Sequence, residues 1–265
     1  MPAKLRVQLV GPPPAHAFQY ANELRALVYV WIGRCRPERA SAFHGANAPK
    51  PYAISPVQSE GDRCWFQVSL LDDRLVGPVT EVAAREGKLR LGQEPYTLVG
   101  VQVREEVTWE ELLPTEVRAR PRFRVRLLTP TAQHVPGPHR KVAVVPSAEN
   151  YFASWLNRWK LCAGQWECAP FAVDESVLGA VESNVVIAGF KGGTEVVRNL
   201  DARRQFLGFV GEVEFEVLRP QSLSHGVRAS LEALGWLANY CGTGVETMRG
   251  MGQTEVRIEE KAGGR

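Results

Sequence analysis

The 265-residue sequence lacks the patterns of several common protein classes. Its five cysteines are scattered, form no C-x-x-C pair and fit neither a disulfide framework nor a zinc site. No cluster of Asp and Glu stands at metal-ligand spacing, which disfavours a two-metal nuclease. There is no apolar run long enough to span a bilayer and no signal-peptide pattern at the N-terminus. We therefore expect a cytoplasmic protein with no membrane contact, no metal site and no cofactor.

The two common phosphate-binding motifs are also missing. A Walker loop, G-x-x-x-x-G-K-[ST], does not occur, and the G-x-G-x-x-G of dinucleotide-binding folds is broken because Thr247 stands at the third glycine position after Gly242 and Gly244. This stretch follows residues 223–240, whose apolar spacing predicts a helix, so it leaves a helix C-terminus where the dipole is negative. These features disfavour a mononucleotide cofactor.

Glycine is instead concentrated in "YCGTGVETMRGMGQTEV", residues 240–256, at Gly242, Gly244, Gly250 and Gly252. Such a density lets the backbone approach a ligand closely and turn its N–H groups toward phosphate oxygens. Arg249 adds a cation, whereas Glu246 would repel a phosphate. The sequence predicts a nucleic-acid-binding loop, and the alternative is a tight structural corner.

Arginine alternates with apolar residues in "VRARPRFRVRLL", residues 117–128. In an extended chain, a period of two sends all the guanidinium groups to one face and the apolar side chains to the other. We predict that this row binds phosphates, and the alternative is a solvated strand face. The row consists of Arg118, Arg120, Arg122, Arg124 and Arg126.

The order of expected elements repeats. In the first part, "KLRVQLV", "PYAIS", "CWFQVSLL" and "YTLVGVQV" read as strands, and residues 15–33 and 72–87 read as helices, with a loop after residue 33. A similar order follows from residue 122 onward, with helices at 147–162 and 223–240. We predict an α+β fold of two tandem ferredoxin-like (βαββαβ) domains, residues 1–115 and 116–265, with a C-terminal glycine-rich loop.

Three sequence motifs of the second predicted domain resemble those of one protein family. The loop "GTGVETMRGMG", after a helix in the second ferredoxin-like domain, is similar to the G-h-G-x-x-x-x-x-G-h-G loop of RAMP-type endoribonucleases, which cut CRISPR precursor RNA at its repeats. "TAQHV" after "RLLTP" resembles the family's S/T-P-T element, and "GFVGEVEFEV" resembles its G-F-h-G strand. Many relatives carry a lysine where this sequence has Glu246. In this family the loop also contributes to the domain interface, which is compatible with both interpretations of the glycines.

RNA cleavage without a metal needs a base for the 2′-hydroxyl, an acid for the leaving oxygen and a cation beside the phosphorane. Histidine suits the first two roles, and His44 lies in the polar stretch "RASAFHGANAPKPY" that we expect to be a loop. His16 and His225 stand near helix starts, and His134 and His139 lie in a later loop that could touch RNA.

The family places its catalytic histidine in or just after the first helix, often with a tyrosine upstream and a lysine downstream. Tyr29 and Lys50 stand around His44 at offsets that resemble this arrangement. The resemblance therefore implies catalytic roles for His44, Lys50 and Tyr29. Further expected RNA contacts are His139, Arg140 and Lys141 beside the arginine row and the glycine loop. On the residues alone, Tyr29 could equally be a core aromatic and Lys50 a solvated lysine.

The sequence thus predicts a metal-independent endoribonuclease that binds and cleaves CRISPR repeat RNA, and the resemblance implies a 2′,3′-cyclic phosphate product. One alternative is a non-cleaving repeat-RNA-binding subunit of a CRISPR effector complex. Another is an unrelated ferredoxin-like enzyme such as a phosphate-ester hydrolase. The expected partners are the repeat RNA and other effector subunits, with the chain as a monomer or a homodimer.

Overall fold

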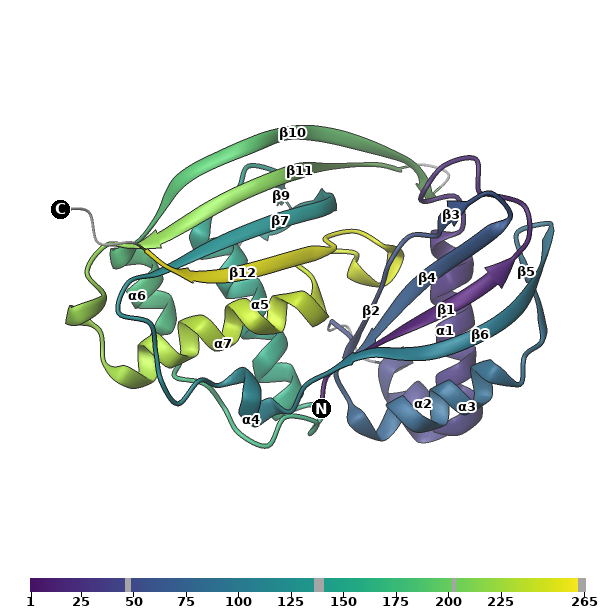
Figure 1. Cartoon of the computed structure of the whole chain (residues 1–265), viewed down its shortest axis with the longest axis horizontal. Coiled ribbons are helices and arrows are strands. Elements are labelled where there is room, and N and C mark those ends of the chain that lie inside the picture. Colours follow the sequence, from purple (N-terminus) through teal and green to yellow (C-terminus); the bar gives the residue numbers. More distant parts are fainter. Residues whose placement is uncertain (46–48, 136–140, 202–203, 262–265) are drawn as a thin grey trace.

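The computed structural model describes residues 1–45, 49–135, 141–201 and 204–261. Two curled antiparallel sheets stand next to each other, each with its long helices packed against one face (Figure 1). The first half of the chain forms one sheet with its helices, and the second half forms the other. The N-terminus lies between the two halves.

The first sheet has the strand order β2-β4-β1-β6-β5, with β3 paired to β4. Its strands are β1 (Ala3–Val10), β2 (Tyr52–Ile54), β3 (Gln58–Glu60), β4 (Arg63–Leu70), β5 (Lys88–Leu91) and β6 (Glu94–Glu106). Its helices are α1 (Ala21–Cys35), α2 (Pro37–Gly45), η1 (Asp73–Leu75) and α3 (Val76–Ala84). Alternate residues of β1 are buried, as the sequence pattern requires of a sheet with helices on one face.

The second sheet has the order β10-β11-β7-β12. Its strands are β7 (Pro121–Thr131), β10 (Val185–Asp201), β11 (Arg204–Val217) and β12 (Thr254–Glu260), beside a small sheet of β8 (Gln133–Val135) and β9 (Lys141–Ala143). The helices of this half are α4 (Trp109–Leu112), α5 (Ala148–Ala163), α6 (Val177–Asn184), η2 (Pro220–Ser222), α7 (His225–Cys241) and η3 (Thr247–Arg249).

Both halves share one topology, which confirms the predicted tandem ferredoxin-like fold. In each, the first strand is central, the strand after the first crossover lies at or near an edge, and the last strand pairs with the other side of the first. The described part of the connection between the sheets, from β6 to β7, contains the short helix α4. We propose, as predicted, that the domain boundary falls in this connection, near residue 115.

The first helical region differs from the expectation of one helix followed by a loop. A second helix, α2, begins at Pro37 directly after α1. Arg36 precedes the proline and has an extended φ of −144°, because the proline ring disfavours the helical conformation in the residue before it. Pro37 itself suits the first position of a helix, where its missing N–H costs no hydrogen bond. The break between α1 and α2 therefore has a local cause.

The segment from 185 to 217 forms a long hairpin of β10 and β11, which arches toward the first half of the molecule (Figure 1). Gly192 pairs with Gly211, and a side chain on either would overlap the backbone of the partner strand. Near the far end of the hairpin, buried Val197 packs with Ala21 of α1 and Met251 of the glycine stretch. The hairpin thus connects both halves of the molecule.

Candidate active site

His44 lies in the last turn of α2 and is exposed, so the prediction that it sits in a loop is wrong. Its ring centre is 6.0 Å from that of Tyr29 on α1. The Tyr29 hydroxyl donates to the carbonyl of Ala40, at 3.1 Å, and so ties α2 to α1. The structure therefore brings Tyr29 and His44 together, with Tyr29 half-buried and His44 accessible.

Lys50 is only 9% exposed, which the interpretation as a solvated lysine does not fit. Its ammonium nitrogen lies 6.0 Å from the centre of the Trp166 ring, and its carbonyl accepts a hydrogen bond from Nη1 of Arg158. Burial, and after it the charge of Arg25, lowers the pKa of the Lys50 ammonium. The lysine is thus held in a fixed, partly desolvated environment.

Arg25 is a residue of this region that the sequence analysis missed. It lies one helical turn before Tyr29 on α1, and its charge acts on both Lys50 and Tyr52. Burial raises the pKa of Tyr52 to about 12, against the opposing effect of Arg25. The spacing of four residues between Arg25 and Tyr29 could have indicated a shared helix face.

The local chemistry matches the needs of phosphodiester cleavage by a 2′-hydroxyl. The accessible imidazole of His44 can act as an acid or a base, and Arg25 and Lys50 place positive charge in the same region. Tyr29 ties together the two helices that carry Arg25 and His44. We call His44, Tyr29, Lys50 and Arg25 the histidine site.

The arginine row is divided by the structure. Only Arg122, Arg124 and Arg126 lie on β7, whereas Arg118 and Arg120 precede the strand, so the five do not share one strand face as expected. Arg118 pairs with Glu232 of α7, whose side chain is fully buried. The backbone N–H of Arg120 donates to Glu260.

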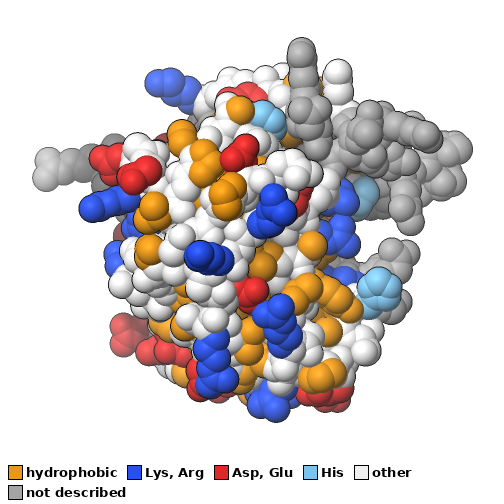
Figure 2. Space-filling view, turned by 90° about the vertical axis from the view of Figure 1, so that its right-hand side faces the viewer, with side chains coloured by type: hydrophobic (Ala, Val, Ile, Leu, Met, Phe, Trp, Pro, Cys, Tyr) orange, Lys and Arg blue, Asp and Glu red, His pale blue; other side chains and the backbone are white. Residues whose placement is uncertain are grey.

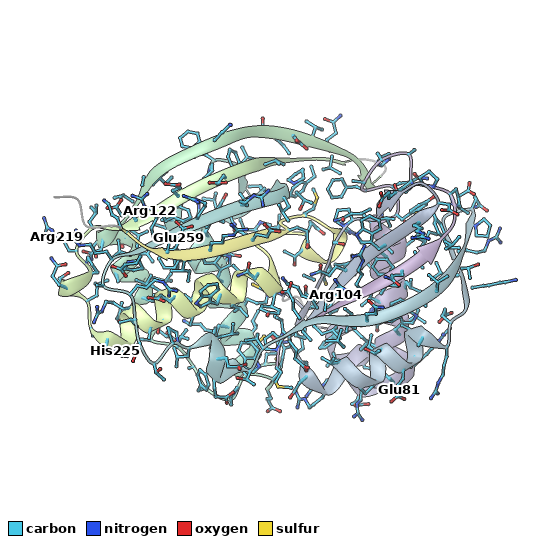
Figure 3. All side chains as sticks on the ribbon, viewed as in Figure 1. Glu81, Arg104, Arg122, Arg219, His225 and Glu259 are labelled. Carbon is cyan, nitrogen blue, oxygen red and sulfur yellow. The ribbon has the colours of Figure 1, made fainter. Side chains whose placement is uncertain are left out.

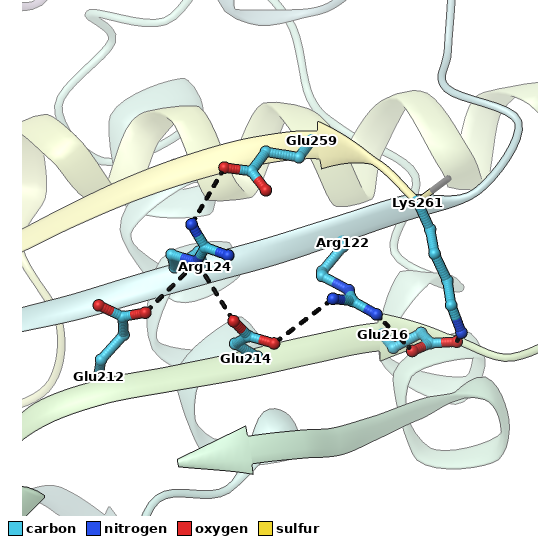
Figure 4. A network of polar contacts seen from close by, with 7 residues as sticks. All are labelled: Arg122, Arg124, Glu212, Glu214, Glu216, Glu259 and Lys261. Atoms are coloured by element: carbon cyan, nitrogen blue, oxygen red, sulfur yellow. Dashed lines mark hydrogen bonds and ion pairs between the residues drawn. The ribbon is translucent and has the colours of Figure 1, made fainter. Parts of the chain in front are cut away.

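The three strand arginines face carboxylates on the neighbouring strands β11 and β12, and Figure 4 shows the contacts of Arg122 and Arg124. Arg124 pairs with Glu212, Glu214 and Glu259 at 3.2–3.4 Å. Arg122 pairs with Glu214 and Glu216, and Lys261 also reaches Glu216. Arg126 pairs with Glu255 at 2.9 Å. That the row binds phosphates stays a prediction, and these internal partners weigh against it.

The glycine loop, residues 242–252, is packed against protein on several sides. Gly242, Gly244, Gly250 and Gly252 all have positive φ, between 63° and 87°, which only glycine adopts at low cost. Side chains on them would crowd backbone atoms of Gly252, Ala132, Pro56 and Thr243, respectively. These close approaches are those of a tight structural corner.

The same loop contacts the first half of the chain. Gln253, just beyond it, donates to the carbonyl of Ile54 in β2, at 3.0 Å, and Gly250 packs on Pro56. Glu246 has a left-handed φ of 58° and pairs with Arg249 at 3.2 Å, so the loop cation already has a carboxylate partner. Contact between the loop and RNA stays a prediction.

The remaining predicted residues lie elsewhere or beyond the described chain. His16, His134 and His225 are exposed, and Figure 3 places His225 at the opposite end of the molecule from α1 and α2. His139 and Arg140 lie outside the described residues, and Lys141 begins β9. Within residues 1–45, 49–135, 141–201 and 204–261, no group of three or more His, Cys, Asp and Glu could hold a metal ion. No helix in these ranges is long and apolar enough to cross a membrane.

The first-domain end of the molecule carries a mixed surface. Figure 2 shows Lys and Arg side chains distributed over this face between hydrophobic and acidic ones, with histidine among them. Positive charge is thus spread rather than gathered in one patch on the face that this view shows. Such a surface can attract a polyanion without defining its path.

Comparisons with known proteins agree with this fold. The model of the family "CRISPR-associated endoribonuclease Cas6" matches residues 125–254. A comparison with curated proteins gave no match. Among solved structures, the Cas6 (TTHB231) product complex has a TM-score of 0.79 at 24% identity, covering 97% of this chain and 100% of that chain. The Cas6 (TTHA0078) product complex has a TM-score of 0.75 at 24% identity, covering 97% and 99%.

A further structure, Thermus thermophilus Cas6 (TTHB231), has a TM-score of 0.70 at 25% identity and covers 97% of this chain and 98% of that chain. The similarity thus extends over nearly the whole length of both chains, whereas the family model matches mainly the second half. Together with the glycine loop and the two ferredoxin-like sheets, these matches give one conclusion. Residues 125–254 match the model of the CRISPR-associated Cas6 endoribonuclease family, and nearly the whole chain has the fold of solved Cas6 structures.

Proposed function

We propose that this chain binds the repeat RNA of CRISPR precursor transcripts and cleaves it at the histidine site, without a metal ion. The match of residues 125–254 to the Cas6 endoribonuclease model supports the endoribonuclease activity. Similar solved structures are described as product and substrate-mimic complexes of Cas6 and as a RAMP protein that binds different RNA substrates. The observation that carries the proposal is the accessible His44 beside Tyr29, in a region that also holds the cations Arg25 and Lys50.

The reaction follows from these groups. A base removes the proton of the 2′-hydroxyl, and the 2′-oxygen attacks the adjacent phosphorus. The bond from phosphorus to the 5′-oxygen breaks, and an acid protonates that oxygen, which leaves a 2′,3′-cyclic phosphate and a 5′-hydroxyl. His44 serves as the base or the acid. Lys50 and Arg25 stabilise the added negative charge on the phosphorane, and a partly desolvated cation is effective in this role.

The test is cleavage of end-labelled repeat RNA in the presence of EDTA. The repeat encoded nearest to the gene is the substrate, and a scrambled RNA of equal length is the control. Cleavage at one position in EDTA supports the proposal if the new 3′ end resists a phosphatase alone but can be extended after acid has opened the cyclic phosphate and a phosphatase has removed the resulting monophosphate. Tight binding without cleavage supports a non-cleaving repeat-binding subunit. If the protein neither binds nor cleaves the repeat RNA, this result contradicts both the endoribonuclease and the non-cleaving subunit.

A further inference from the structure

Two of the first-domain elements that carry the histidine site contact one and the same part of the second domain. His44 lies on α2, and Lys50 lies in the extended segment that leads into β2. The second-domain part is α5 with the turn that follows it, residues 164–169, and it contributes Arg158 and Trp166. We call Arg158 and Trp166 the clamp.

Trp166 contacts both elements at once. Its indole N–H donates to the carbonyl of Pro49, at 3.1 Å, and the Lys50 ammonium lies over its ring. On the other side, its ring meets Phe43 edge to face, with centres 5.0 Å apart. Phe43 is the neighbour of His44 on α2. Trp166 is 2% exposed, so its position is fixed by packing on all sides.

Arg158 acts on the same segment from within α5. One guanidinium nitrogen, Nη1, donates to the Lys50 carbonyl, and Nη2 donates to the Thr247 hydroxyl of the glycine loop, at 3.1 Å. Arg158 is 6% exposed and Thr247 3% exposed. A charged hydrogen bond to a buried carbonyl is strong and directional, so it fixes the backbone at Lys50.

The clamp is itself anchored to the first domain. The carbonyl of Trp166 accepts from Arg39 of α2, at 3.0 Å, and from Arg74, at 2.9 Å. Fully buried Asp72 pairs with both arginines. Trp166 is also held to its own domain, because its backbone N–H donates to the Leu161 carbonyl of α5, at 2.8 Å. The Trp166 residue therefore has little freedom relative to α2.

We propose that Trp166 and Arg158 are positioning residues for RNA cleavage: they set the place of Lys50 relative to His44. This inference rests on the proposed function of the histidine site. Each element alone could move by a fraction of an ångström, and a displacement of about 1 Å can reduce an enzymatic rate by about 10². The clamp binds both elements to one rigid helix end and so removes this freedom.

The test compares two buried tryptophans, each of which donates its indole N–H to a backbone carbonyl. Trp166→Phe removes the N–H donor to Pro49 of the first domain, and Trp159→Phe removes an equivalent donor, which bonds the Phe171 carbonyl within the second domain at 3.0 Å. Both tryptophans are buried, so the two variants lose similar packing. We expect Trp166→Phe to lower the single-turnover cleavage rate at saturating enzyme by at least about tenfold, with RNA affinity within about twofold of wild type. Trp159→Phe should retain the wild-type rate.

Variants of Arg158 provide a second, independent test of the same inference. Arg158→Met should lower the same rate, and Arg158→Lys, which keeps one cation able to donate to the Lys50 carbonyl, should restore part of it. Equal rates in wild type and Trp166→Phe, or equal loss in Trp166→Phe and Trp159→Phe, overturn the inference and leave the proposed function standing. A wild-type protein that cleaves no repeat RNA overturns both.

Discussion

At the scale of single residues, His44 is the group on which the proposed chemistry depends. Because His44 is exposed and its ring neighbour Tyr29 is tied to Ala40, we expect His44→Ala to leave the fold intact. The single-turnover cleavage rate should fall by about 10² to 10⁴, the usual contribution of a positioned acid or base, with RNA affinity nearly constant. His225→Ala, at the other end of the molecule, is the control. A wild-type rate in His44→Ala would transfer the role to His134 or His139.

Replacing Lys50 with methionine should have opposite effects on stability and on activity. Since burial lowers the pKa of its ammonium, the folded state binds the proton less tightly than the unfolded state, and keeping Lys50 charged costs folding free energy. Lys50→Met should therefore raise the free energy of unfolding at neutral pH. The gain should shrink as pH rises from the lowered pKa to the ordinary lysine value, because the wild type becomes more stable over that interval.

The same variant should cleave RNA at least about tenfold more slowly, because the cation beside the phosphorane is lost. Denaturant unfolding at several pH values and single-turnover cleavage measure the two effects. A variant that is less stable than wild type at neutral pH would mean that the contacts of the ammonium outweigh its burial.

The residues of the histidine site differ in how far a sequence can predict them. Tyr29, His44 and Lys50 could be predicted because their spacing resembles that of a known family. Arg25 could have been predicted because it precedes Tyr29 by four residues on the same expected helix. The burial of Lys50 was not predictable, because it depends on Trp166, which lies 117 positions from Pro49 in the chain. Contacts of this separation leave no local pattern.

At the scale of elements, the arginines of β7 illustrate the same limit. Their alternation predicts one shared face, but the structure fills that face with glutamates of β11 and β12. The strand "GEVEFEV" alternates in the same way, so the partners were visible in the sequence, whereas the pairing of the strands was not. The helix α2 was missed for a local reason, because its mixture of proline, glycine and polar residues resembles a loop.

The ion pairs between the β7 arginines and the glutamates of β11 and β12 lead to a prediction about the salt dependence of RNA binding. An arginine that neutralises a phosphate reduces the slope of log affinity against log salt by about 0.7 to 0.9 when it is removed. Because Arg122 and Arg124 are engaged with carboxylates, we expect the double variant Arg122→Ala, Arg124→Ala to keep the wild-type slope. Arg25→Ala, at the histidine site, should reduce it. A reduced slope in the double variant would show that Arg122 and Arg124 bind phosphates despite their glutamate partners.

The glycine loop predicts a loss of stability without any change in charge. Gly244 has a φ of 83°, and a methyl group there would overlap the carbonyl of Ala132. We expect Gly244→Ala to lower the free energy of unfolding by at least about 2 kcal/mol, measured by denaturant titration. Gly179→Ala, in α6 with open space around it, should leave it unchanged or raise it by up to about 1 kcal/mol. Equal stability of Gly244→Ala and wild type would mean that the loop rearranges freely.

At the scale of the whole molecule, the two ferredoxin-like domains share one core. A single cluster of buried residues runs from β1 and α1 through Trp166 to α5, α7 and the second sheet. We therefore expect calorimetry to give one unfolding transition with equal calorimetric and van't Hoff enthalpies. Two separate transitions would show that the contacts between the domains contribute little to folding.

The clamp also affects how the family can vary over evolution. Trp166 and Arg158 bind the carbonyls of Pro49 and Lys50, which are main-chain atoms that any residue would supply. Because the Trp166 bond to position 49 uses only a main-chain atom, substitutions at position 49 need no compensating change at 166. Pairwise covariation between homologous sequences should be weak for these contacts. Relatives could then exchange the side chains that meet their own RNA while the geometry beneath them stays the same.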